Sequence, residues 1–319
     1  MICISTDESL IKVGRQGLTK IEINHRQQLE KFLKKVNIKL SDYTFANNYM
    51  WFENADGYYK IINGNLCMFI NNGALTMLLP PLGGEKQEET MHECFRIMNE
   101  FNGDYHSSKI DYVYDGYIDN IDFGIYEVER QNPDYIYLAK EITELKGNKY
   151  KTKRNENNYF IKNYKFNYEP YSCVHRDAAM ELLYRWAAKR LETITTHSVD
   201  HFVELMDLER KAITRVLDQY KELDLKGAVV IIDGKIEGIT FGEKINDNTA
   251  SILIEKTNYE YFGISQFLFR QFCESAFGDC EFMNVGDDLG FENLRKVKMS
   301  YHPYAYGPKY TIRQKYAIN

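Results

Sequence analysis

The sequence predicts an α+β protein built from two copies of one domain, each a mostly antiparallel mixed sheet flanked by helices. Three observations lead to this fold class. The chain has 319 residues, which suits about two domains. Its residues are 44% hydrophobic and 14% aromatic, which is enough to build ordered cores. Finally, one order of predicted elements, three strands followed by a helix, occurs twice.

The first copy is centred on a hairpin turn at Asn63-Gly64. Both positions of such a turn require positive φ, which Asn and Gly adopt readily. A second turn, at residues 71–73, leads to a third strand and then to the sequence PPLGG. The helix that follows has apolar residues at helical spacing. The predicted strands span 57–62, 65–70 and 74–79, and the predicted helix spans about 85–101.

The second copy has its hairpin turn at Asp233-Gly234, 170 positions after the first turn (63 to 233). Another turn, at residues 246–248, again precedes a third strand and a helix. A repeat of this order over such a distance is best explained by two domains of one kind. The predicted strands span 227–232, 235–242 and 249–255, and the predicted helix spans about 263–276.

The remaining segments extend both copies. Asp287-Asp288 is expected at the start of a helix, because aspartate is favoured there. We place the domain boundary near Phe166, which gives an N-terminal domain of residues 1–165 and a C-terminal domain of residues 166–319. The further predicted helices span 149–164, 175–192, 199–221 and 289–299, the further strands span 166–174 and 281–285, and a tyrosine-rich terminal strand follows.

Charge is distributed unevenly along the chain. The formal net charge is −6, which argues against a general nucleic-acid coat protein. Residues 146–165 nevertheless contain seven basic residues and one acid, Glu156, and residues 291–319 contain six basic residues and one acid, Glu292. An acidic body with two basic strips is typical of a focused anion site. Two solvated helix faces are the alternative.

Several classes of protein are disfavoured by missing motifs. P-loop, dinucleotide-binding, α/β-hydrolase and zinc-protease signatures are all missing from the sequence. His197 and His201 have the spacing of helical metal ligands, but neighbouring Thr and Ser favour a capped helix start, so we expect no metal site. No apolar run approaches the roughly 20 residues of a membrane-spanning helix, and no secretory signal is visible. We therefore expect a cytoplasmic protein.

The strand at 249–255, its loop and the next helix resemble the acyl-CoA N-acetyltransferase (GNAT) superfamily. In that superfamily the helix N-terminus cradles a pyrophosphate, because its free N–H groups and the helix dipole favour an anion. The loop Arg/Gln-x-x-Gly-x-Gly/Ala corresponds here to residues 260–265. Gly263 matches and Ser265 is small, but Glu260 would repel a diphosphate. We therefore expect poor binding of acetyl-CoA at this loop and at its counterpart after Gly83-Gly84.

Residues 284–290 (NVGDDLG) and 294–303 (LRKVKMSYHP) resemble the C-terminal signature of the phosphatidylglycerol lysyltransferase C-terminal domain family, in its short soluble members. Residues 42–47, 79–83, 145–155 and Glu255-Lys256 extend the resemblance to about residues 40–313. The resemblance implies a tandem GNAT fold, as in the Fem-type peptidoglycan aminoacyltransferases. It also implies acyl or aminoacyl transfer by direct attack of an amine or hydroxyl.

The membrane-bound relatives move lysine from lysyl-tRNA to a lipid hydroxyl. This chain lacks their transmembrane part, and it departs from the family at two places. Val285-Gly286 stands where members usually carry Arg-Glu, and Glu156 stands where they usually carry His. Under the implied fold both basic strips would approach one cleft between the domains. We therefore prefer the anion site over two solvated helix faces.

Four residues are candidates for catalysis. Glu255, at a strand end, is the candidate general base, with an exposed strand-end carboxylate as the alternative. Asp287 and Asp288 would bind an aminoacyl ammonium or serve as the base, although one of them is expected to cap a helix. Tyr301 would be a general acid or, alternatively, a packed aromatic. The candidate donor-binding residues are Lys153, Arg154, Asn155, Lys256, Gly263, Ser265, Asn284, Arg295 and Lys298.

No tightly bound cofactor is expected. The donor would be acyl-CoA or aminoacyl-tRNA, and the acceptor would be a lipid or a cell-wall precursor. The competing hypothesis is a non-catalytic ligand- or RNA-binding protein on a degenerate tandem GNAT scaffold. The sequence leaves the oligomeric state open.

Overall fold

The computed structural model describes residues 6–52, 55–192 and 199–316. The chain divides into two compact units. Unit 1 comprises Met1–Ile38, Asp42–Asn132 and Pro308–Asn319, and unit 2 comprises Lys39–Ser41 and Pro133–Gly307.

This division differs from the boundary expected at residue 166, for two physical reasons. The basic helix α7 (Lys151–Asn163) packs against α10 (Ile264–Phe277), and both helices belong to unit 2. The last strand, β14 (Lys309–Gln314), is hydrogen-bonded to β5 (Lys109–Tyr114) and β6 (Tyr126–Arg130) of unit 1. Neither long-range pairing has a local signal in the sequence.

Unit 1 contains one mixed sheet in the order β1-β2-β3-β4-β5-β14-β6. Its strands are antiparallel apart from β4 and β5, which pair in parallel at Met77↔Ile110. The side chains of Met91, Phe95 and Met98, which have helical spacing in the sequence, are all buried in the core. The other elements are α1 (Thr6–Arg15), β1 (Thr19–Lys20), α2 (Arg26–Leu33), α3 (Phe45–Tyr49), β2 (Asp56–Ile62), β3 (Asn65–Asn71), β4 (Leu75–Met77), α4 (Gln87–Asn102) and α5 (Asp115–Ile118).

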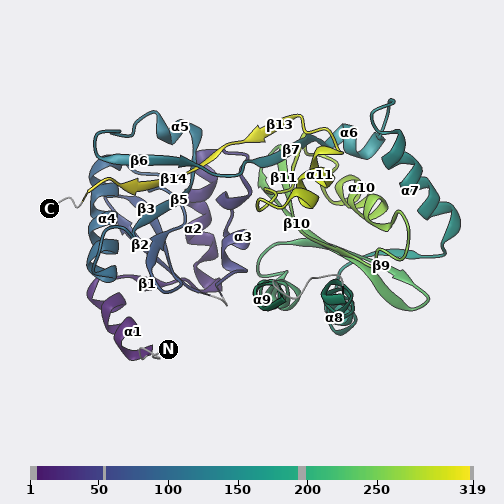
Figure 1. Ribbon diagram of the computed structural model, residues 1–319, viewed down its shortest axis with the longest axis horizontal. Coiled ribbons are helices and arrows are strands. Elements are labelled where there is room, and N and C mark those ends of the chain that lie inside the picture. Colours follow the sequence, from purple (N-terminus) through teal and green to yellow (C-terminus); the bar gives the residue numbers. More distant parts are fainter. Residues whose placement is uncertain (1–5, 53–54, 193–198, 317–319) are drawn as a thin grey trace. The chain divides into compact units, whose positions relative to one another are not determined.

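Unit 2 contains a second mixed sheet in the order β13-β7-β12-β11-β10-β9-β8. Helix α10 lies on one face of this sheet, and α8 and α9 lie on the other (Figure 1). Its other elements are β7 (Asp134–Leu138), α6 (Ala139–Glu144), β8 (Asn167–Pro170), α8 (Arg176–Glu192), α9 (Val199–Gln219), β9 (Lys226–Ile232), β10 (Lys235–Asn246), β11 (Thr249–Thr257), β12 (Phe282–Asn284), α11 (Glu292–Met299) and β13 (Ala305–Gly307).

The arrangement of three strands followed by a helix is present in both units, so the predicted tandem architecture is confirmed. In unit 2 the parallel pairing of β11 with β12 runs from Thr249↔Phe282 to Ser251↔Asn284. Strand β11 then continues to Thr257 without β12. The two strands therefore separate in the middle of the sheet, and β11 contacts α10.

Two local expectations are corrected. Helix α11 begins at Glu292 after an N-cap at Phe291, so the two aspartates do not cap it. Instead Asp287 accepts a hydrogen bond from the Leu289 N–H, and Asp288 accepts one from the Gly290 N–H. Both bonds join residues two apart, as in the turns that aspartate commonly forms. The terminal strand exists, but it completes the sheet of unit 1.

Candidate active site

Glu255 lies on β11 beyond Ser251, which is the last residue of that strand to pair with β12. The residues on either side of it show which way it faces: Thr257 shares a hydrogen bond with Ser265 of α10, at 2.6 Å, while Lys256 pairs with Glu209 of α9. Because successive side chains of a strand point to opposite faces, Glu255 faces α10.

The backbone of Glu255 pairs with Thr240 of β10, but its side chain forms no hydrogen bond or ion pair with another described residue. The residue is partly exposed. Burial raises the pKa of Glu255 to about 8. A carboxylate that has lost water and gained no partner favours its protonated form.

Tyr301 closes the same space from the segment after α11. Its side chain is 7% exposed, and its ring centroid lies 5.1 Å from that of Phe269 and 6.0 Å from that of Tyr137. Burial raises the pKa of the Tyr301 hydroxyl well above its usual value, and the charges of Glu255 and Glu156 raise it further. The hydroxyl therefore stays protonated at neutral pH and is available as a hydrogen-bond donor.

Helix α7 contributes a cation and a second carboxylate. The Lys153 ammonium lies 4.8 Å from the centroid of the Tyr301 ring and 3.6 Å from Glu156 Oε2. The two side chains are only 13% and 21% exposed, and Glu156 Oε2 is buried without a hydrogen bond. Glu255, Tyr301, Lys153 and Glu156 thus form one cluster, which we call the polar cluster. Glu156 was not predicted as a site residue, although it is the one acid in its basic strip.

Gly263 has a different role from the one expected. Its φ is +86°, and a Cβ added there would lie 2.1 Å from the Glu156 carbonyl oxygen. The glycine is therefore required for the close approach of the α7 backbone. Glu260 is exposed, and Lys189 lies 2.5 Å from its carboxylate, which lowers the pKa of Glu260.

Four other predicted residues hold the segment 284–298 in place. Asn284 is fully buried and donates to the Lys39 carbonyl at 2.6 Å and to Asp134 at 2.8 Å. Asp288 accepts from Arg295 and from the Tyr135 hydroxyl, each at 2.7 Å, and the Arg295 guanidinium holds the pKa of Asp288 at about 2. Lys298 donates to the carbonyls of this segment.

The remaining candidates lie outside the polar cluster. Lys256 is on the opposite face of the sheet, with its ammonium 3.8 Å from the centroid of the Trp186 ring. There it lines a cavity of about 180 Å³ between α8 and α9. Arg154 donates to the carbonyls of Leu145 and Gly147, at 2.5 and 3.0 Å. Asn155 is exposed on α7.

The two basic strips meet within unit 2. The Tyr150 hydroxyl donates to the Tyr301 carbonyl at 3.0 Å, and the His302 ring nitrogen lies 3.1 Å from the Lys149 carbonyl oxygen. Lys153, Arg154, Arg295 and Lys298 all belong to this unit, whereas the sequence placed them on two domains. A common anion site requires such contiguous strips, although Arg295 and Lys298 are engaged in local bonds.

Within the described ranges, no group of three or more His, Cys, Asp or Glu residues could hold a metal ion. His197 lies outside the described residues, and so does the side chain of His201. Within the same ranges, no helix has the length and apolar character needed to cross a membrane.

A model of the family "Phosphatidylglycerol lysyltransferase, C-terminal" matches residues 34–313. The chain belongs to this family. The resemblance inferred from residues 284–303 is therefore confirmed. A comparison with curated proteins gives no significant match.

Three solved structures share the fold. A conserved protein of unknown function from Bacteroides thetaiotaomicron has a TM-score of 0.83 at 23% identity, covering 93% of this chain and 99% of that one. The C-terminal domain of a putative lysylphosphatidylglycerol synthetase from Agrobacterium fabrum has a TM-score of 0.62 at 14% identity, covering 92% of each chain. L-PGS from Bacillus licheniformis has a TM-score of 0.58 at 16% identity, covering 98% of this chain and 93% of that one.

Proposed function

We propose that this member of the family is an aminoacyltransferase that moves an aminoacyl group from aminoacyl-tRNA to an amine or hydroxyl acceptor. One observation carries the proposal: the Glu255 side chain has no partner among the described residues, and it is close enough to Tyr301 for its charge to raise the pKa of that hydroxyl, where β11 and β12 separate. A carboxyl whose pKa is raised to about 8 has a proton affinity suited to base catalysis near neutral pH.

The reaction needs no covalent enzyme intermediate. The acceptor oxygen or nitrogen attacks the ester carbonyl of the donor while Glu255 takes its proton. The Tyr301 hydroxyl donates a hydrogen bond to the oxyanion that forms. The ester C–O bond then breaks, and the proton held by Glu255 passes to the departing ribose oxygen, so that the carboxylate is regenerated.

The charges of the polar cluster favour an aminoacyl group over a simple acyl group. The charges of Glu255 and Glu156 both act on Tyr301, and among the described residues Lys153 is the cation over its ring. When both acids are ionised, this space carries excess negative charge, which suits the ammonium of an aminoacyl ester. An acetyl group is uncharged and would gain no such electrostatic stabilisation. Binding of the ammonium would also lower the pKa of Glu255 and favour its basic form.

The donor end of the site also disfavours a CoA thioester. The first turn of α10, where a pyrophosphate was expected, is covered by α7 at Gly263. The phosphates of a tRNA would instead follow the basic strip of α7.

The test measures consumption of radiolabelled aminoacyl-tRNAs in the presence of amine and hydroxyl acceptors, including phosphatidylglycerol and a cell-wall precursor. Acetyl-CoA serves as the competing donor. We expect transfer from one class of aminoacyl-tRNA, and loss of that transfer in Glu255→Gln with no change in circular dichroism. Transfer from acetyl-CoA alone, or undiminished transfer by Glu255→Gln, would contradict the proposal.

A second candidate is a binding protein without catalysis. It is favoured by the same raised pKa, because a carboxyl with a pKa of about 8 is mostly protonated at pH 7 until a cation arrives. This candidate predicts stabilisation by tRNA with no transfer at any pH. A ligand at 100 times its dissociation constant adds about 2.7 kcal/mol to the free energy of unfolding, which a thermal shift detects.

A further inference from the structure

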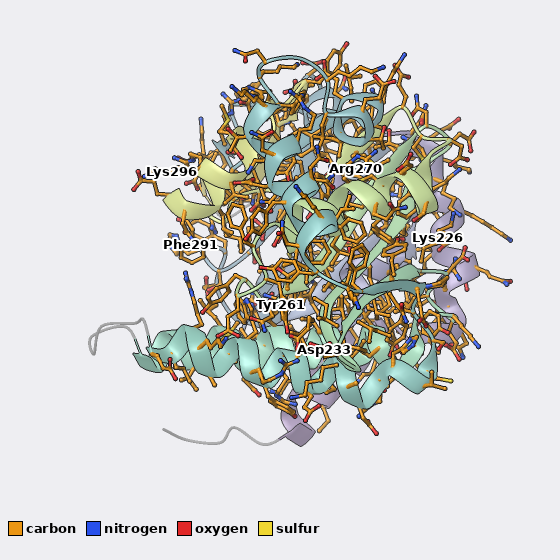
Figure 2. The ribbon with its side chains drawn as sticks, turned by 90° about the vertical axis from the view of Figure 1, so that its right-hand side faces the viewer. Lys226, Asp233, Tyr261, Arg270, Phe291 and Lys296 are labelled. Atoms are coloured by element: carbon orange, nitrogen blue, oxygen red, sulfur yellow. The ribbon has the colours of Figure 1, made fainter. Side chains whose placement is uncertain are left out.

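An exposed pair of aromatic rings lies one helical turn beyond the polar cluster. Tyr159 follows Glu156 on α7, and its side chain is 46% exposed. The ring of Phe262, which is 53% exposed, has its centroid 5.2 Å from that of Tyr159. Tyr164 continues the row, with its ring centroid 6.3 Å from that of Tyr159. Helix α7 lies at the right-hand end of Figure 1, the side that faces the viewer in Figure 2.

Cations accompany these rings. Lys162 and Lys165 lie beside Tyr159 and Tyr164 in the sequence, and both are exposed. Neither forms an ion pair with an acid among the described residues, in contrast to Lys153 and Lys189. Two lysines without counter-charges make this end of α7 attractive to an anion.

On its other side, the row of aromatic rings borders acidic residues instead of lysines. Tyr261 contacts Tyr164, with 5.3 Å between ring centroids, and lies towards Asp233 in Figure 2. Burial raises the pKa of Tyr261, and the charges of Glu237 and Asp233 raise it further. A polyanion would therefore follow Tyr159, Phe262 and Lys162 rather than Tyr261.

We propose that Tyr159 and Phe262 form a stacking site for the bases of single-stranded RNA, at the aminoacylated end of the donor. The inference rests on the proposed function and adds a subsite to it. Bases stack on exposed aromatic rings whatever their sequence, while lysines contact the phosphates. Because α7 carries both Tyr159 and Lys153, a strand stacked here would lead its terminal ester towards Tyr301.

Charge and side-chain type favour RNA over other occupants. A lipid surface would require aliphatic side chains, and Ile161 is the one exposed aliphatic between Tyr159 and Lys165. Flat rings beside lysines without acidic partners match alternating bases and phosphates. Binding of vesicles or of a protein through the same rings would be an outcome against the proposal.

The first experiment measures fluorescence anisotropy of a labelled single-stranded RNA of about 12 nucleotides, which is within the usual site size. We expect Tyr159→Ala and Phe262→Ala each to weaken binding about 5- to 150-fold, and Tyr159→Phe to retain it. The control is Phe123→Ala, which removes a ring that is 55% exposed in unit 1 and should change nothing. Equal binding by all four variants would overturn the inference.

Salt dependence separates the lysines from the rings. The double variant Lys162→Ala with Lys165→Ala should lower the slope of log K against log salt by about 1.4, since each phosphate contact of a single strand contributes about 0.7. The ring variants should shift affinity at every salt concentration and leave the slope unchanged. An unaltered slope in the lysine variant would show that Lys162 and Lys165 do not contact the phosphates of the RNA.

Kinetics distinguish failure of this inference from failure of the proposed function. With full-length aminoacyl-tRNA, Tyr159→Ala should raise KM and leave kcat unchanged, while transfer from a short aminoacyl-nucleoside should not change. If aminoacyl-tRNA is used but its KM is unaffected, the stacking site is wrong and the function stands. If RNA binds through the rings but no donor is consumed, the function is wrong and the RNA site stands. Binding of anionic vesicles that depends on the rings, without RNA binding, would refute the stacking site.

Discussion

The two units share one topology but carry different side chains at an equivalent position. This position is where the third strand of the meander pairs with its parallel neighbour. In unit 1 that strand, β4, ends at Met77, and the surrounding side chains are apolar. Cys67 and Cys94 pack beneath it without exposure, and burial raises the pKa of the Cys94 thiol. In unit 2 the longer β11 carries Glu255 into a partly buried position, where its side chain has no partner among the described residues. Unit 1 uses the position for packing, and unit 2 uses it to hold an ionisable group.

The helix that follows the meander gives a second comparison. In unit 1 the residues before α4 fold against the first hairpin: Asn65 accepts a hydrogen bond from the Gly84 N–H, and a Cβ on Gly84 would lie 2.7 Å from the Gly64 carbonyl carbon. In unit 2, Gly263 meets α7. Both glycines thus permit close backbone packing. A glycine at such a loop does not by itself indicate a phosphate site.

The largest effect is expected at the point where the two units differ most. Glu255→Gln should reduce kcat/KM of aminoacyl transfer about 10²- to 10⁴-fold, because a general base typically contributes that factor. The measurement is transfer from labelled aminoacyl-tRNA at saturating acceptor. Glu127→Gln, on an exposed position of β6 in unit 1, is the control and should retain full activity. A loss of less than tenfold in Glu255→Gln would assign the proton transfer to another group.

The pH dependence of stability provides a second test of the partly buried carboxyl that distinguishes unit 2 from unit 1. The folded pKa of Glu255 is about 8, above the ordinary value of about 4.3 expected for the unfolded chain. Between these values the folded state keeps a proton that the unfolded state has released. The free energy of unfolding of the unmodified protein should therefore fall with rising pH, relative to Glu255→Gln, by up to about 1.4 kcal/mol per pH unit.

Urea unfolding of both proteins at several pH values between 5 and 9 measures this divergence. The difference should flatten above pH 8, where Glu255 is ionised in both states. Activity should rise with pH to the same limit, because the carboxylate is the basic form. Parallel stability curves for the two proteins would mean that water reaches Glu255 freely, and the general-base assignment would lose its physical basis.

The packing of α7 on α10 is tested by two glycines with the same backbone angle. Gly263 and Gly147 both have φ of +86°, but a Cβ on Gly147 would meet no atom within 4 Å. Gly147→Ala should cost about 1–2 kcal/mol of unfolding free energy through backbone strain alone. Gly263→Ala should cost about 1–3 kcal/mol more, because the new methyl overlaps the Glu156 carbonyl. Equal losses of unfolding free energy in the two variants, measured by chemical denaturation, would show that α7 does not pack closely against the residues at Gly263.

Local patterns in the sequence account for much of the fold and for part of the site. Hairpin turns such as Asn63-Gly64 and amphipathic helices such as α4 are determined by neighbouring residues, so their positions were predicted well. The placement of β14 in unit 1 and of α7 in unit 2 depends on contacts between distant residues, which one sequence does not reveal.

The same limit applies to the site. Glu255 and Tyr301 were predicted and do lie together, but the closeness of Glu156 required the packing of α7. Conversely, Arg295 and Lys298 have the helical spacing of a phosphate site, yet their side chains are held by Asp288 and by backbone carbonyls. Spacing shows which residues share a helix face. It does not show whether a local partner already occupies them.

The smallest effect is expected at Glu260, which the sequence identified as the obstacle to acetyl-CoA. Its carboxylate is exposed and pairs with Lys189, so its charge is already balanced and open to solvent. Under the proposed function the obstacle is instead the α7 backbone at Gly263, which a change of charge does not move. Calorimetry should therefore find weak acetyl-CoA binding in the unmodified protein and no gain beyond about twofold in Glu260→Gln. A gain of tenfold or more, about 1.4 kcal/mol, would show that Glu260 does face the donor. Micromolar binding by the unmodified protein would show that a diphosphate fits at α10 despite α7, and unit 2 would then differ from unit 1 at its helix as well as at its strand.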